Sequence, residues 1–229
     1  MSVDASAELA AIDLYGAELL RAAEERSGAT ALRAIDEHGE ELPLALERYL
    51  GHAAAEERGV LERAVGPVLD IGCGPGRHIV ALERQGVIAV GLDISPLAVR
   101  LARSRGASVI EGSIFNRVPH AGYWGSALLL DGNIGIGGAP FELLARVGSL
   151  LRPDGVILVE VEGPNIRAHT LKVRLIADGA STHRFPWARL GIEDLGAIAT
   201  RAGFVVSEHW KAGSRWFAAL TADERKLAA

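Results

Sequence analysis

Three glycines stand close together where an apolar stretch of the chain gives way to a helical one. The stretch reads VLDIGCGPGRHIVAL, residues 68–82, and its glycines are Gly72, Gly74 and Gly76. Glycine has no Cβ and adopts positive φ without strain, so a ligand can lie directly against the backbone of such a turn. The helix that follows offers free N–H groups and a positive dipole end, which favour an anionic group. The motif therefore predicts a ligand-binding loop.

The spacing of these glycines narrows the class of ligand. A dinucleotide-binding loop has the pattern G-x-G-x-x-G, and Arg77 occupies the position of its third glycine here. A P-loop would need G-K-S or G-K-T after the glycines, and neither follows. Because a glycine triplet alone does not decide between cofactors, the acidic residues beside it carry the argument further.

An aspartate ends each of the first two predicted strands. Asp93 ends the strand VIAVGLD, where a carboxylate can accept hydrogen bonds from both hydroxyls of a ribose. Asp70 ends the first strand and precedes the glycines, where an acid would repel a pyrophosphate but attract the ammonium group of an amino acid. The pair favours a cofactor that combines a nucleoside with an amino acid. The alternatives are an ordinary strand-end acid for Asp93 and a helix cap for Asp70.

The elements that position these residues alternate between strands and helices. Short β-branched and leucine-rich runs predict strands, and most are followed by a helical pattern of about ten residues. This alternation predicts an α/β fold with a doubly wound, mostly parallel sheet that helices cover on both faces. The last two strands are joined by the short segment KAGS, which predicts a hairpin and an antiparallel strand at the edge. The predicted strands are PVLDIG, VIAVGLD, ASVIEG, SALLLD, VILVEVEG, FVVSEHW and RWFAALTA.

The chain divides into an N-terminal segment and a larger core. Residues 1–64 are rich in Ala, Glu and Arg with helical spacing of apolar residues, so we expect a helical cap; residues 65–229 form the α/β core. Residues 163–189 interrupt the core between its fifth strand and the next helix. A compact domain rarely carries so long a connection without a purpose. We expect a substrate lid, with a surface elaboration or an oligomer contact as the alternative.

Composition restricts the partners and the compartment. The chain has 229 residues, a net charge of −5 and a pI near 5.8, so we expect no nucleic-acid partner. Cys73 is the sole cysteine, which excludes an internal disulfide and a cysteine-based zinc site. The N-terminal residues lack the basic region of a secretory signal, and no apolar run reaches the roughly 20 residues of a membrane span. We therefore expect a cytoplasmic protein without a membrane partner.

Four segments resemble, in order and spacing, the motifs of class I S-adenosylmethionine-dependent methyltransferases of the small-molecule type. They are VLDIGCGPGRHIVAL, GLDISPLAVRLA, SVIEGSIFNRVP and LLRPDGVILVE, within residues 66–220. The resemblance implies a Rossmann-like sheet of seven strands in the order 3-2-1-4-5-7-6, with the inserted last strand antiparallel. It also implies that residues 1–64 cap the cofactor, that this cofactor is S-adenosylmethionine, and that S-adenosylhomocysteine is the product.

The resemblance assigns the residues around the cofactor to its chemical parts. Members of the family often have aspartate where Ser113 stands. The implied contacts are Asp70, Gly72, Gly74 and Gly76 with the methionine part, Asp93 with the ribose hydroxyls, Ile94, Ser113 and Ile114 with the adenine, and Asp131 between the cofactor and the acceptor.

The acceptor side has candidate substrate contacts of its own. Asp131 and Asn133 lie in LLLDGNIGIGG after the fourth strand, where a role in holding the loop is the alternative. Trp187 in the inserted segment and Tyr15 in the cap are further candidates, with packing as the alternative. The segment DGNIG lacks the Asp-Asn pair of metal-dependent catechol methylation, so we expect no metal.

Two histidines of the inserted segment are candidate catalytic bases. His169 and His183 could each deprotonate a hydroxyl or an amine of the acceptor. A lone histidine on the surface or in packing is the alternative for each.

The expected function is that of an enzyme which transfers a methyl group to O or N of a small molecule by in-line displacement. Because the sulfonium is already activated, the protein mainly aligns the reactants and excludes water. One alternative is a protein that binds S-adenosylmethionine without catalysis, since a fold does not determine function. An NAD(P)-dependent oxidoreductase is another, against which Arg77 argues, and a nucleic-acid or protein methylase is a third.

Overall fold

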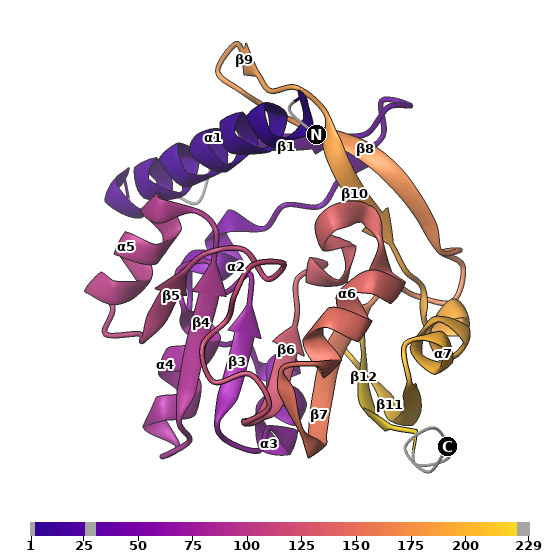
Figure 1. Cartoon of the computed structure of the whole chain (residues 1–229). Helices are drawn as coiled ribbons and strands as arrows, with labels where there is room; N and C mark the ends of the chain where they lie inside the picture. The colour runs from indigo at the N-terminus through magenta and orange to yellow at the C-terminus, as the bar shows by residue number, and fades with distance from the viewer. Residues whose placement is uncertain (1–2, 26–30, 224–229) are drawn as a thin grey trace.

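A sheet of seven strands forms the centre of the computed structural model, which describes residues 3–25 and 31–223 (Figure 1). Its strands, in chain order, are β3 (Val68–Ile71), β4 (Ala89–Asp93), β5 (Val109–Glu111), β6 (Trp124–Leu129), β7 (Leu151–Val161), β11 (Phe204–Ala212) and β12 (Arg215–Ala222). They lie in the order β11-β12-β7-β6-β3-β4-β5, which confirms the order that the family resemblance implies.

The antiparallel strand of this sheet is β12. It pairs antiparallel with both β7 and β11, whereas β3, β4, β5, β6 and β7 pair in parallel. The expectation of an antiparallel strand at the edge is therefore wrong, because β12 is inserted between β7 and β11. The short hairpin after β11 places β12 between β11 and β7. A hairpin pattern in the sequence does not show whether its second strand lies at the edge or inside the sheet.

Helices cover both faces of the sheet because its strands are apolar on both sides. All four residues of β3 are buried, as expected for a parallel strand in the middle of a sheet. Leu143 and Leu195 belong to the apolar core on one face, and Ile79 and Leu82 belong to the core on the other. The helices of this core are α3 (Arg58–Arg63), α4 (Arg77–Arg84), α5 (Pro96–Ser104), α6 (Pro140–Gly148) and α7 (Ile192–Arg201).

A second, smaller sheet joins the N-terminal segment to the inserted segment. Its main strands lie in the order β10-β8-β1-β2, all antiparallel, and β9 pairs with β8. Its strands are β1 (Arg33–Ile35), β2 (Glu41–Leu42), β8 (His169–Ala177), β9 (Ala180–Ser181) and β10 (Phe185–Arg189).

This sheet corrects two expectations. Residues 1–64 are not helical throughout, because β1 and β2 lie between α1 (Val3–Glu25) and α2 (Leu46–Leu50). The inserted residues 163–189 are largely strands rather than irregular chain. Since β1 has three residues and β2 has two, the pairing of β1 with β8 and of β2 with β1 depends on tertiary contact and leaves little pattern in the sequence.

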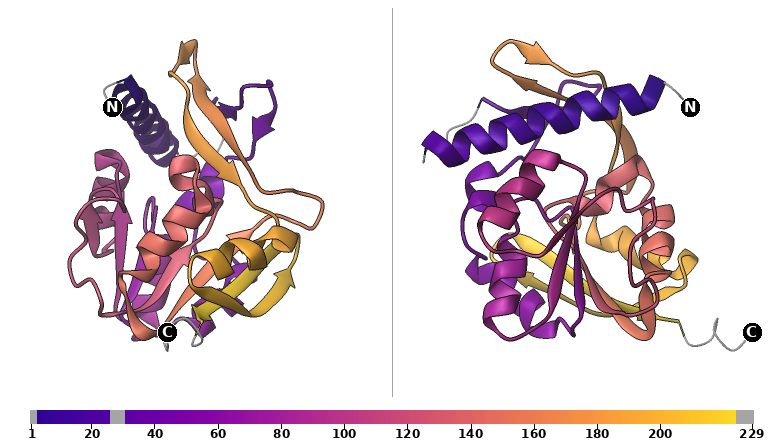
Figure 2. Two further views of the ribbon diagram at one scale, coloured as in Figure 1. Left: turned by 45° about the vertical axis from the view of Figure 1, so that its right-hand side comes forward. Right: turned by 60° about the vertical axis from the view of Figure 1, so that its left-hand side comes forward.

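The second sheet and α1 lie together over one end of the large sheet. We name α1, α2 and the second sheet the covering layer. Figures 1 and 2 show α1 crossing above the ends of β3, β4 and β6, with β8 and β10 beside it. The parallel strands point toward this end, so the segments that follow their carboxyl ends face the covering layer. Within residues 3–25 and 31–223, none of the helices has both the length and the apolar character that crossing a bilayer requires.

Candidate functional site

A cavity of about 460 Å³ lies between the carboxyl ends of the large sheet and the covering layer. This volume falls in the range of roughly 300–1,000 Å³ that is typical of small-molecule sites. Of the residues predicted from sequence, those that line it are Tyr15, Gly72, Gly74, Asp93, Ile94, Ser113, Ile114, Asp131, Asn133 and Trp187.

The glycine loop has the left-handed backbone that its sequence predicts. Gly72, Gly74 and Gly76 have φ values of 68°, 52° and 78°. A Cβ on Gly74 would lie 3.4 Å from the hydroxyl oxygen of Tyr15, so bare backbone faces the cavity below this hydroxyl. Burial and the nearby Asp93 carboxylate raise the pKa of Tyr15 well above its ordinary value, which keeps the hydroxyl protonated and able to donate.

Gly76 does not line the cavity, which corrects its assignment to the methionine part. A Cβ there would meet the Cβ of Ala107 at 2.8 Å. Gly76 is the N-cap of α4, and its φ of 78° begins this helix next to the end of α5. A positive φ and close packing, not contact with a ligand, explain glycine at this position.

Asp93 lies at the end of β4 with its carboxylate buried at the cavity wall. One carboxylate oxygen accepts from the backbone N–H of Gly74 at 2.7 Å, and the other accepts from that of Ser95 at 2.8 Å. Burial raises its pKa, while these backbone hydrogen bonds oppose the rise. Each oxygen keeps a second lone pair for a donor in the cavity. The side chain thus both fixes the glycine loop and can accept from a ligand.

Asp70 lies beneath the loop and does not line the cavity, which corrects its expected contact with the ammonium group. Its carboxylate is buried, and its Oδ2 lies 3.3 Å from Nδ1 of His78 in α4. The Nε2 of His78 lies 3.3 Å from a carboxylate oxygen of Glu57. Burial alone would lower the pKa of His78, but the two carboxylates raise it to about 9. Asp70 therefore stabilises an imidazolium inside the protein.

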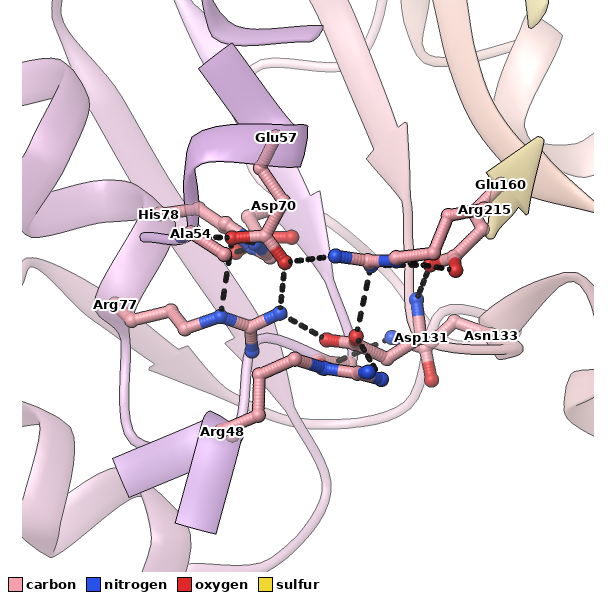
Figure 3. Close-up of polar contacts among 12 residues, drawn as sticks. Arg48, Ala54, Glu57, Asp70, Arg77, His78, Asp131, Asn133, Glu160 and Arg215 are labelled. Atoms are coloured by element: carbon pink, nitrogen blue, oxygen red, sulfur yellow. Dashed lines mark hydrogen bonds and ion pairs between the residues drawn. The ribbon is translucent and has the colours of Figure 1, made fainter. Parts of the chain in front are cut away.

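Glu57 and Asp131 are joined through arginines in a buried ion-pair network (Figure 3). Arg77, 4% exposed, lies 2.6 Å from a carboxylate oxygen of each acid. Arg215 at the start of β12 also contacts both acids, at 2.6 Å and 3.1 Å. Burial opposes ionisation of Glu57, but His78 and Arg77 outweigh burial and lower its pKa. We use the name charge network for the set formed by Glu57, Arg77, His78, Asp131, Glu160 and Arg215.

The charge network holds Asp131 at the cavity wall. The backbone N–H of Asp131 donates to Glu160 at 2.7 Å, and Arg215 holds Glu160 at 2.6 Å. Arg48 of α2, which also lines the cavity, contacts the other side of Asp131 at 2.9 Å. Asp131 is therefore oriented by three arginines at the wall of the cavity.

The charge network does not fit a metal ion. Oxygen and nitrogen atoms of Glu57, His78 and Asp131 lie within 4.8 Å of one another, which is close enough to share a cation. Arg77 and Arg215 already compensate both carboxylates at distances of 2.6 to 3.1 Å, and the His78 imidazolium adds a further positive charge. A cation among these groups would be repelled.

The two histidines predicted as bases lie outside the cavity, and this corrects their catalytic assignment. Both rings are exposed, and Nδ1 of His169 lies 2.8 Å from the carbonyl oxygen of Arg167. All seven histidines of the chain fall in the part that the structure describes, and none of them lines the cavity. The sequence shows that both residues are histidines of the inserted segment. It does not show in which direction their side chains point.

Asn133 lines the cavity, but its amide group also holds the glycine loop. Its Nδ2 donates to the carbonyl oxygens of Ile71 and Gly72 at 2.8 Å and 3.0 Å. Sequence reasoning missed Arg48 and Glu57, which come from the N-terminal segment without a motif. Arg77 directly follows the glycine loop, and this position could have identified it as a residue of the site.

Comparison with known proteins agrees with this geometry. Residues 68–155 match the family described as "Methyltransferase domain". A solved S-adenosylmethionine-dependent methyltransferase from Bacteroides fragilis, in complex with S-adenosylhomocysteine, is 26% identical, with a TM-score of 0.76 over 93% of this chain and 96% of that chain. The match with the Bacteroides protein includes the N-terminal segment and the second sheet as well as the core.

Two less similar structures share the fold. CcbJ methyltransferase from Streptomyces caelestis is 14% identical, with a TM-score of 0.63 over 92% of this chain and 98% of that chain. The 1,6-didemethyltoxoflavin-N1-methyltransferase of Burkholderia thailandensis is 19% identical, with a TM-score of 0.55 over 74% of this chain and 79% of that chain.

The residues of the cavity fit S-adenosylmethionine. Gly74 leaves bare backbone for its amino-acid part, Gly72 lines the cavity beside the Asn133 side chain, and Asp93 offers a buried carboxylate at the strand end. From the glycine loop, the strand-end acid, the strand order and these comparisons, we conclude that residues 68–155 form a methyltransferase domain and that the chain is similar in fold to S-adenosylmethionine-dependent methyltransferases.

Proposed function

We propose that this enzyme methylates O or N of a small-molecule acceptor. The observation that carries the proposal is the covering layer: α1, α2 and the second sheet all contribute residues to the cavity wall. A cavity of about 460 Å³ beneath such a cover suits a small molecule better than a polymer. The didemethyltoxoflavin methyltransferase, which is similar in fold, was solved with a small-molecule acceptor bound.

In this proposal the cofactor is held by residues from three strand ends. Asp93 accepts from the ribose hydroxyls, and Gly72 and Gly74 pack against the methionine part. Ile94, Ser113 and Ile114 border the adenine at the ends of β4 and β5. Tyr15 reaches the glycine loop from the covering layer, with its hydroxyl 3.4 Å from where a Cβ on Gly74 would lie, and Arg48 reaches Asp131 at 2.9 Å. This moves Tyr15 from the acceptor to the cofactor side.

S-adenosylmethionine supplies an activated methyl group when it is bound. The tasks left to the chain are to align the acceptor atom with that methyl group and to keep water out. Alignment of reactants is worth roughly 7–11 kcal/mol in favourable cases. Asp131, with its orientation fixed by three arginines, and Trp187 in β10 line the part of the cavity assigned to the acceptor.

The proposal is tested with S-adenosylmethionine that carries an isotopic label in its methyl group. The labelled cofactor is incubated with the enzyme and a panel of phenols, alcohols and amines, with the low-mass fraction of a cell extract, and with DNA, RNA and protein. We expect label in low-mass products, and much less with Asp93→Asn than with the exposed control Asp154→Asn. Label that enters only protein or nucleic acid would contradict the proposal.

A further inference from the structure

The second sheet presents a continuous apolar surface to the cavity. In the register of this sheet, Ala34 lies directly opposite Leu42 of β2 on one side and Leu175 of β8 on the other. Residues that oppose each other in antiparallel strands point to the same face. Leu42, Ala34 and Leu175 therefore form one row across three strands, and all of them line the cavity.

A second apolar row lies beside the first. Phe185 of β10 is in register with Val173 of β8, and both line the cavity. Trp187 lies two residues after Phe185, so it points to the same face, and the two rings meet edge to face at 6.3 Å. We name these six residues, Ala34, Leu42, Val173, Leu175, Phe185 and Trp187, the apolar roof.

The other face of the same sheet is charged. Arg33 and Glu41 form an ion pair at 3.0 Å there, and Lys172 and Arg174 alternate with the inward-facing residues of β8. Apart from Ile35 and Ile176, which share the charged face, the sheet thus has one polar face and one apolar face toward the cavity. Part of the apolar face lies over the cavity instead of over packed side chains. Its apolar residues can therefore contact a ligand as well as form core.

Apart from Asp93, the acidic groups of the cavity offer no free carboxylate for a cationic acceptor. Among the described residues that line it, the acids other than Asp93 are each paired with arginine: Asp131 with Arg48, Glu160 with Arg215 and Glu162 with Arg189. Burying a charged molecule against the apolar roof would remove its hydration without compensation. An uncharged molecule meets no such cost.

We propose that the acceptor is an uncharged molecule with an apolar body, and that this body packs against the apolar roof. Ala34 sets the size of the body, because its methyl group stands between two leucines and leaves a recess in the row. The inference rests on the proposed function, since it describes the acceptor of that same site.

The test measures binding to the enzyme saturated with S-adenosylhomocysteine. The probe is 2-naphthol, which is uncharged and fluorescent, and its anionic counterpart is 2-naphthalenesulfonate. We expect saturable binding of naphthol and binding of the sulfonate that is weaker by about tenfold or more. Naphthol that does not saturate the protein, or a sulfonate that binds as tightly, would overturn the proposal.

Variants of Ala34 test the recess. Ala34→Leu fills it and should weaken naphthol binding by about tenfold or more, as overpacking of a formed site does. Ala34→Ser adds only a hydroxyl and should weaken binding severalfold, so it decides the matter if the leucine variant does not fold. The control Ala180→Leu lies on exposed β9 and should change nothing. Unchanged naphthol affinity in both Ala34 variants would overturn the proposal.

Two further readouts separate this inference from the proposed function. Affinity for S-adenosylhomocysteine should stay unchanged in the Ala34 variants, which shows that the cofactor side is intact. Methyl transfer to small molecules without naphthol binding would overturn the apolar acceptor alone. Naphthol binding with methyl transfer only to macromolecules would overturn the proposed function and, with it, the assignment of the roof to the acceptor.

Discussion

Glu57 and Arg215 meet inside the protein although 158 positions separate them, with Nη1 of Arg215 lying 2.6 Å from Oε1 of Glu57. Glu57 ends the 3-10 turn η1 (Ala55–Glu57) before the core, and Arg215 begins the strand inserted into the large sheet. The contact ties the N-terminal segment to the last strand, next to the cavity wall that Asp131 forms. Stability of the fold and geometry of the site therefore share one buried cluster of charges.

Replacing Glu57 should destabilise the protein strongly. Glu57→Gln leaves Arg77 and Arg215 buried with less compensating charge, and breaking a buried pair in this way costs about 3–5 kcal/mol. We expect the free energy of unfolding, measured by urea denaturation, to fall by this amount. The neighbouring Glu56 is exposed, so Glu56→Gln is the matched control and should change stability little. Equal stability of the two variants would show that the charge network is not needed for folding.

His78 should make stability depend on pH in the alkaline direction. Its pKa rises from an ordinary 6.5 to about 9 in the folded protein, so its contribution is fully present below pH 6.5 and is lost as the pH rises through about 9. That difference corresponds to roughly 3 kcal/mol. Unfolding of the wild type is measured between pH 6 and 9, below the range in which the buried thiol of Cys73, whose pKa burial raises, adds a decline of its own; the decline should be absent in His78→Gln. The exposed control His169→Gln should keep the decline; a wild type without it would refute the buried imidazolium.

Asp93 should dominate the affinity for the nucleoside part of the cofactor. Asp93→Asn keeps the shape but loses the charge that receives the ribose hydroxyls, and hydrogen bonds to charged groups contribute about 1.5–3 kcal/mol. Calorimetric titration with S-adenosylhomocysteine should show a loss of tenfold or more. Because burial raises the pKa of Asp93, affinity of the wild type should begin to fall in acid above the ordinary aspartate range. Asp154→Asn, on the surface, serves as the control, and an unchanged affinity in Asp93→Asn would remove the ribose assignment.

Gly74 can be compared with a glycine that has open space around it. Both Gly74 and Gly106 have positive φ, 52° and 89°, so alanine at either position costs roughly 1–2 kcal/mol of backbone strain. Only Gly74 lines the cavity, whereas a Cβ on Gly106 meets nothing within 4 Å. We expect Gly74→Ala to lose affinity for S-adenosylhomocysteine by about tenfold more than Gly106→Ala does. Equal affinities would mean that the loop does not touch the ligand.

The sequence allowed the core of the fold and much of the cavity to be predicted. Strands and helices of the core have strong local patterns, and Asp93 lies at a strand end that parallel topology always brings to the same edge. The sheet order came from the family resemblance. Asp70 and Gly76 were assigned to the cofactor because they share the motif, yet Asp70 faces His78 and Gly76 packs against Ala107. Position in a motif does not fix the direction of a side chain.

The covering layer could not be predicted in the same way. The strands β1 and β2 are too short to show alternation, and β8, which pairs with β1, follows more than a hundred residues later. The charge network is likewise invisible in the sequence, since Glu57, Asp131 and Arg215 are brought together only by the completed fold. His169 and His183 were chosen for their chemistry, and nothing in the sequence showed that they are exposed.

The pairing of β1 with β8 means that the covering layer is not a detachable module. If residues 1–42 were removed, one edge of β8 would lose its neighbour β1, and an open strand edge favours association with other chains. To exchange acceptor specificity between relatives, residues 33–42 and residues 169–189 would have to be replaced together. The reason is that β1 and β8 pair with each other and both contribute residues to the cavity. Evolution of new acceptors in this protein is thus constrained to paired changes in two distant stretches of its gene.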